Sequence, residues 1–95
     1  MTQGEPRETR APKLAIVEEI LAELDRAEKL HPLLGNIFFR KTEIHRQLVH
    51  LDKAVFNVTG WINHGQPIPD EDLAACRKQA VQVAAMAIRF ILILP

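Results

Sequence analysis

The side chains with the most evident capacity for chemistry lie on two segments with helical periodicity. Asp52 follows His45 by seven residues, so both lie on one flank of the same predicted helix. Asp72, Gln79 and Gln82 fall near one stripe of a later helix. Carboxylate and amide oxygens and imidazole nitrogens can bind metal ions. The first pair is either the remains of a metal or phosphate site, or a boundary ion pair or solvated polar edge. The second set is either a remodelled pocket, or an amide network that fixes helix register or a dimer contact.

The two glutamines stand one turn apart in a segment, residues 78–90, that is apolar nearly all round. Burying an amide without a partner costs roughly 1–3 kcal/mol, so Gln79 and Gln82 should each face a polar partner or a site. Only Gln82 and Arg89 interrupt the apolar run over residues 80–94. This run is shorter than the roughly 20 residues of a membrane-spanning helix and carries Arg89 in its middle. We therefore expect a core or interface helix and no membrane span.

Composition limits the possible partners of the chain. Its 95 residues suffice for one small domain, and a core of this size favours a second subunit. Lysine plus arginine equals aspartate plus glutamate at 12 each, so no overall charge attracts nucleic acid or an anionic membrane. Cys76 is the only cysteine, which fits a reducing, cytoplasmic compartment. The chain contains no serine, which excludes serine hydrolase chemistry.

Three helical segments, over residues 13–30, 37–63 and 70–94, predict an all-α fold. Residues 1–12 lack apolar periodicity and are expected to form a disordered tail, which leaves residues 13–95 as a single domain.

Single residues suggest where the helices begin and end. Pro12 suits the first turn of the first helix, and Asn36 and Asp70 are candidate caps for the second and third. Gly60 predicts an end or a kink in the last turn of the second helix.

The predicted second helix carries an apolar seam and a cationic outer side. The seam consists of Ile37, Ile44, Leu48, Leu51, Val55, Val58 and Ile62, and the cationic side of Arg40, Lys41, Arg46 and Lys53. The acids Glu43 and Asp52 are nine residues apart and therefore lie on opposite sides of a straight helix. They are not expected to bind one ion together.

Residues 24–32, Leu-Asp-Arg-Ala-Glu-Lys-Leu-His-Pro, and residues 78–90 resemble MazG-like members of the all-α nucleoside triphosphate pyrophosphohydrolase superfamily. The resemblance implies an antiparallel bundle of three to four helices per chain, completed by dimerisation. It also implies Mg²⁺-dependent cleavage of a nucleoside triphosphate to a monophosphate and pyrophosphate.

The metal-binding motif of the family, carried over by residue, places Gln79 and Gln82 where acids are expected. The second helix offers no pair of carboxylates one turn apart. Two hypotheses follow: a Mg²⁺-dependent pyrophosphohydrolase built from unusual ligands, Asp52, His45, Asp72, Gln79 and Gln82 among them, or a noncatalytic interaction protein of the same fold. In either case we expect a homo-oligomer that forms through the C-terminal helix.

Overall fold

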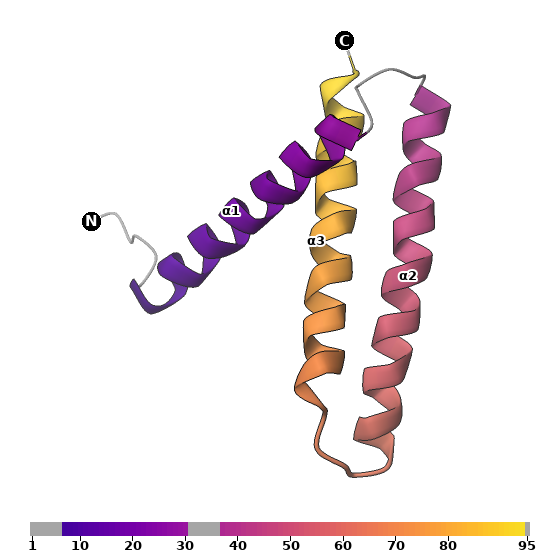
Figure 1. Ribbon diagram of the computed structural model, residues 1–95. Coiled ribbons are helices and arrows are strands. Elements are labelled where there is room, and N and C mark those ends of the chain that lie inside the picture. Colours follow the sequence, from indigo (N-terminus) through magenta and orange to yellow (C-terminus); the bar gives the residue numbers. More distant parts are fainter. Residues whose placement is uncertain (1–6, 31–36, 95) are drawn as a thin grey trace, which may run out of the picture.

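The chain is all-helical throughout its described part. A computed structural model describes the backbone of residues 7–30 and 37–94, and the side chains from residue 10 onward. It contains three helices, α1 (Arg7–Leu30), α2 (Ile37–Asn63) and α3 (Asp70–Leu92), and no strand within these ranges (Figure 1). The predicted all-α class is thus confirmed.

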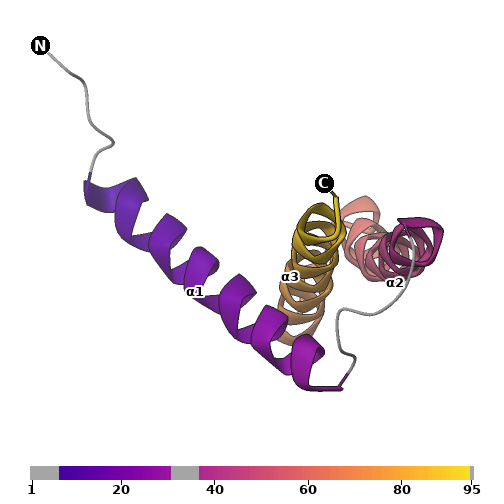
Figure 2. The same ribbon diagram turned by 90° about the horizontal axis from the view of Figure 1, so that it is seen from above.

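Helices α2 and α3 form an antiparallel hairpin, and a turn at His64 and Gly65 follows α2 (Figures 1 and 2). Gly65 has a φ of 66°, a left-handed conformation that suits glycine. Its N–H donates to the carbonyl of Ile62, and the N–H of Gln66 donates to the carbonyl of Trp61, each at 3.0 Å. These two bonds form a Schellman cap on α2. Helix α2 continues through Gly60 to Asn63, so the prediction of a helix end at that glycine was wrong.

The first turn of α3 contains three acids and begins after Pro69. Pro69 occupies the N-cap position, and no side chain caps the helix by a hydrogen bond. Asp70 is the first helical residue, so its predicted role as the cap was wrong. Together with Glu71 and Asp72 it nevertheless places negative charge near the positive end of the helix dipole.

Helix α1 begins earlier than predicted. It begins at Arg7, so Pro12 lies inside the helix and not at its first position. The segment predicted to be disordered therefore forms helix from Arg7 to Pro12, and its remainder, residues 1–6, lies outside the described residues, as does the candidate cap Asn36.

The core lies where the C-terminal half of α1 crosses α3. Leu24 and Ala27 of α1 pack against Ala85 and Met86 of α3. Ala85 has no exposed area, and Ala27 is 2 % exposed. Ile20, Ile44 and Ile88 pack around this cluster. Small side chains at the crossing allow α1 and α3 to approach closely, and α3 contacts both other helices.

The face of α2 that packs on α3 differs from the predicted seam. Arg40, Glu43 and Ala54 are its buried residues. Four seam residues instead remain exposed along one side of α2: Ile37, Leu48, Val55 and Ile62, which are 50, 41, 48 and 60 % exposed. The packed face is rotated about the helix axis relative to the predicted seam. It includes charged residues, which a search for apolar periodicity does not detect.

The N-terminal half of α1 extends away from the hairpin (Figures 1 and 2). In the described ranges α1 has tertiary contacts with α3 and none of note with α2. The chain measures 46 × 43 × 22 Å, and its radius of gyration is 16.2 Å. A compact chain of this length would have a radius of gyration of about 12 Å. The single chain is therefore an open arrangement.

Close packing at the α1–α3 crossing predicts that Ala85→Leu will destabilise the protein by about 1–3 kcal/mol, because the larger side chain has no free space to enter. Ala74→Leu makes the same change at an exposed position of α3 and should have little effect. Urea unfolding followed by circular dichroism measures both. Equal destabilisation by the two variants would contradict this packing.

Candidate functional site

The structure separates the two glutamines of α3. Gln82 lines a small polar cavity at the junction of the three helices. Gln79 is half-buried, and its buried Oε1 atom has no hydrogen-bond partner among the described residues. Only Gln82 therefore occupies the polar setting expected for both.

The other predicted site residues lie apart from this cavity. His45 and Asp52 are exposed on α2, and Asp52 borders a shallow hollow beside Val49 and Phe56. Asp72 is half-buried, and its Oδ2 accepts a hydrogen bond of 2.6 Å from Trp61 Nε1. This bond joins the ends of α2 and α3 near the turn. Asp72 therefore has a structural contact and does not line the cavity that contains Gln82. The prediction that Asp72, Gln79 and Gln82 share one stripe of the helix did not anticipate this separation.

The polar cavity has a volume of about 90 Å³ and is built by all three helices. Helix α1 contributes Glu23, Arg26 and Ala27, helix α2 contributes Glu43, Arg46 and Gln47, and helix α3 contributes Gln82, Met86 and Arg89. These positions recur at helical spacing: Glu43 and Gln47 lie one turn apart, and Gln82 and Arg89 lie two turns apart.

Two fully buried arginines lie at this junction. Arg40 and Arg89 are each 1 % exposed. Arg40 Nη1 pairs with Glu43 Oε2 at 2.9 Å, and Arg89 Nη1 donates to the carbonyl oxygen of Ala27 at 3.2 Å. Arg89 thereby links the end of α3 to α1.

Burial lowers the pKa of Arg89, because a charged guanidinium loses solvation inside the protein. The positive charge of Arg40 lowers this pKa further, while Glu43 and Glu28 oppose the change. The two buried arginines therefore repel each other, and nearby carboxylates offset part of that repulsion.

The burial of these two arginines was not predicted from the sequence. Arg40 was assigned to the cationic outer side of α2, and it is instead the most buried residue of that helix. One signal was available: Arg40, Gln47 and Ala54 follow one another at intervals of seven, so they share one face of α2. Because Ala54 is small and apolar, its presence on this face was a reason to expect burial.

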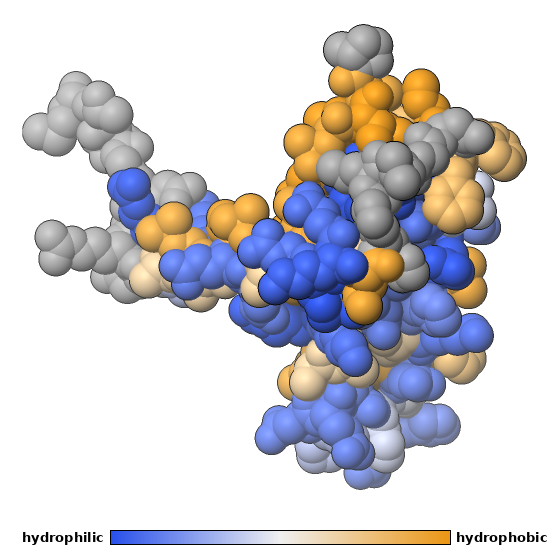
Figure 3. Space-filling model, turned by 45° about the horizontal axis from the view of Figure 1, so that its top comes forward, coloured by the Kyte–Doolittle hydropathy of each residue, from blue (hydrophilic) through white to orange (hydrophobic). Residues whose placement is uncertain are grey.

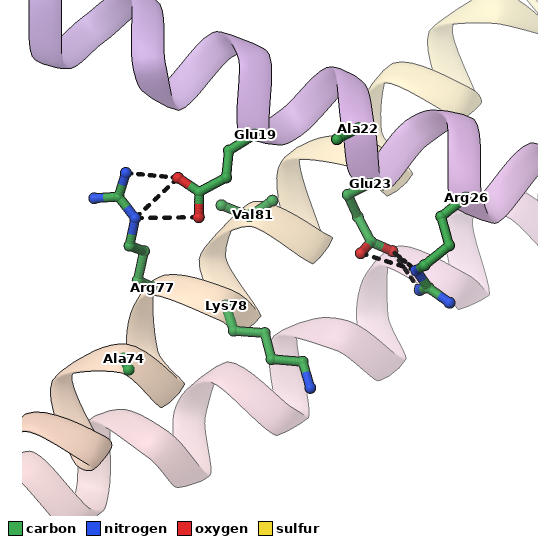
Figure 4. A pocket seen from close by; sticks show the side chains of 8 residues that line it. All are labelled: Glu19, Ala22, Glu23, Arg26, Ala74, Arg77, Lys78 and Val81. Carbon is green, nitrogen blue, oxygen red and sulfur yellow. Dashed lines mark hydrogen bonds and ion pairs between the residues drawn. The ribbon is translucent and has the colours of Figure 1, made fainter.

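A second hollow, an open groove of about 400 Å³, lies between α1 and α3 (Figure 4). Arg77 Nη2 of α3 pairs with Glu19 Oε2 of α1 at 2.6 Å, and Arg26 pairs with Glu23 within α1. Arg77 lowers the pKa of Glu19. The stabilisation that this pair contributes is therefore present at neutral pH and is lost as the pH falls through the lowered pKa of Glu19.

The described residues do not fit a magnesium centre. Among the side chains of residues 10–30 and 37–94, no three or more histidine, cysteine, aspartate or glutamate side chains gather in a way that could hold a metal ion. The two acids at the polar cavity, Glu23 and Glu43, are already paired with arginines. Positive charge from Arg46 and Arg89 further opposes a divalent cation there.

Comparison with known proteins finds no matching family, no matching curated protein and no matching solved structure. None of the three described helices is long and apolar enough to cross a membrane.

Because Arg40 is fully buried, removing the carboxylate that it binds should strongly destabilise the protein. We expect Glu43→Ala to lower the free energy of unfolding by roughly 3–5 kcal/mol. Glu19→Ala removes the exposed pair with Arg77 and should have a far smaller effect, because water screens that pair. Urea unfolding at neutral pH compares the two. A Glu43→Ala variant as stable as Glu19→Ala would show that the buried pair is dispensable.

Proposed function

We propose that this chain is a noncatalytic helical interaction protein that acts as a homo-oligomer. The observation that carries the proposal is the exposed apolar stripe on α1. Leu14, Val17 and Leu21 are 54, 49 and 50 % exposed and lie on one side of the helix. Large apolar side chains in such a row indicate an interface.

Surface area supports the same proposal. The chain has an accessible surface of 7327 Å², whereas a compact monomer of 10.8 kDa has about 5,500 Å². The difference exceeds the roughly 800 Å² that each partner buries in a typical stable interface. A second copy can therefore cover enough surface to form a stable dimer.

An apolar groove beside the stripe offers a place for a helix of a second copy. Its volume is about 260 Å³, and it is lined by five apolar residues and one arginine: Ile16 and Ile20 of α1, and Arg77, Ala80, Val81 and Ala84 of α3. The alanines leave room for a close approach. In a dimer with twofold symmetry, the α1 stripe of each copy would pack into the groove of the other.

The end of α3 and the residues that follow it supply further apolar surface to this interface. Ile91, Leu92 and Leu94 are 65, 54 and 44 % exposed. Hydrophobic side chains gather near the top of the molecule in this view (Figure 3). The balanced charge of the chain supports self-association, because two copies carry no net charge that would repel them.

Catalysis is left out of the proposal because the residues do not suit it. Gln79 and Gln82 stand where the resemblance to MazG-like enzymes expects acids, and the acids near Gln82 are paired with arginines. Mg²⁺ and nucleoside triphosphate are therefore not assigned as cofactor and substrate.

Introducing a charge into the α1 stripe should separate the subunits. We expect the native protein to have at least twice the chain mass by size exclusion with light scattering, and Val17→Asp to have the mass of a single chain. Ala15→Asp places the same charge on the opposite side of α1 and should leave the oligomer intact. A monomeric native protein, or an equal effect of the two variants, would contradict the proposed interface.

Hydrolysis of nucleoside triphosphates provides the test of the noncatalytic assignment. We expect no pyrophosphate release from canonical or modified triphosphates with Mg²⁺ at high protein concentration. Release that is lost in Gln82→Ala and retained in Ala74→Leu would overturn this assignment and favour the pyrophosphohydrolase hypothesis.

A further inference from the structure

One side of α2 carries large apolar side chains that no described helix covers. They form two rows, in which each residue is at least 40 % exposed: Ile37, Leu48 and Val55, and Phe38, Val49 and Phe56. Between the two rows runs a third row of exposed polar residues, Lys41, His45 and Asp52. We call these three rows together the open face of α2.

The open face takes no part in the hairpin or in the α1 interface proposed above. Helix α2 packs on α3 through the side that carries Arg40, Glu43 and Ala54. Ala54 and Leu48 are separated by about 120° around the helix axis. Among the described helices, α1 packs on α3 and leaves α2 uncovered (Figure 2). So many exposed large apolar side chains on one face indicate contact with another molecule.

The polar row has a positive charge at one end and a negative charge at the other. Lys41 and Asp52 are eleven residues apart, which is about three turns, so they lie on the same side of α2. Lys41 Nζ lies over the exposed ring of Phe38, 6.0 Å from its centroid. Neither Lys41 nor Asp52 has an ion-pair partner among the described side chains. A face with opposite charges at its two ends is complementary to an antiparallel copy of itself.

These two charges define how a second copy would align. A twofold axis that passes between residues 46 and 47 brings Lys41 of each copy opposite Asp52 of the other, because both residues are equally far from that axis. Leu48 then lies close to the axis. At a rise of 1.5 Å per residue, the two copies of Leu48 are about 4.5 Å apart along the helices, which suits direct apolar contact.

The apolar rows agree with the same axis. In an antiparallel pair with twofold symmetry, each row meets the same row of the other copy. Ile37 comes opposite Val55, and Phe38 comes opposite Phe56, each to within one residue of the alignment that the charges define. Apolar side chains thus meet apolar side chains, and each charge meets its opposite. This agreement favours a second copy of the chain over an unrelated partner.

We propose that two copies of this chain associate through the open face of α2, with the two helices antiparallel and Lys41 of each copy paired with Asp52 of the other. One face of one helix is smaller than the roughly 800 Å² per partner of a standard interface, so this contact belongs to the weak, transient class. It forms at high protein concentration and dissociates in the dilution of size exclusion. Because it does not use α1, a chain that uses both surfaces can join two other copies.

Reversal of the two charges tests this contact. Sedimentation velocity of the full chain with Val17→Asp, from micromolar to near-millimolar concentration, measures association without the α1 interface. We expect dimers to form as the concentration rises. Addition of Lys41→Glu or Asp52→Lys should weaken association at least about tenfold, because like charges then meet at both ends of the contact. An equimolar mixture of these two variants should associate again, since each pair then joins a lysine to an acid.

Lys53→Glu is the matched control. It makes the same change of charge one residue from Asp52 but about 100° away around the helix, and should leave association unchanged. Circular dichroism verifies that all variants are folded.

Three results would overturn the proposal. They are no association at any concentration, an equal loss in Lys41→Glu and Lys53→Glu, or a mixture that associates no better than either variant alone. The mass at low concentration reports on the α1 interface, whereas the charge reversal reports on the open face of α2. Failure of one contact can therefore be told apart from failure of the other.

Discussion

The packing of α1 on α3 is the contact on which the rest of this fold depends. Ala85 has no exposed area and lies against Leu24 and Ala27 of α1, with Met86 beside it. Among the described helices α1 packs mainly on α3, so this crossing sets the direction of α1 relative to the hairpin. Larger side chains here would move the helices apart. The polar cavity and the apolar groove both border this crossing, so both depend on its close packing.

The same crossing brings buried charge close to a small core. The fully buried Arg40 and Arg89 occupy interior space that apolar side chains would usually fill. Such groups are tolerated where carboxylates and carbonyls satisfy them, as Glu43 and Ala27 do here. Replacing a buried ion pair with apolar side chains often leaves stability unchanged or improves it.

Exposed apolar surface and buried charge together explain why the chain has an open form. Of the hydrophobic residues described, the fully packed ones are mainly alanines, whereas leucines, isoleucines and valines face solvent on every helix. An isolated monomer would gain little from such an arrangement. A second copy that covers α1 and the end of α3 would bury the large side chains that the single chain leaves exposed.

The sequence by itself determined the helices. Helical periodicity, the turn residues around Gly65 and the acids that begin α3 are local features, and they located α2 and most of α3 within a residue or two. The opposite placement of Glu43 and Asp52 also followed from helix geometry: one is buried and the other exposed. Only the tertiary structure decided which face of each helix is inside, because that depends on the neighbour against which it packs. The apolar pattern predicted that Leu48 and Val55 are buried and that Arg40 is exposed. In the structure α2 packs on α3 so that Leu48 and Val55 are exposed and Arg40 is buried. The junction that gathers Glu23, Glu43, Gln82 and Arg89 draws on all three helices, and no spacing along a single helix could predict it.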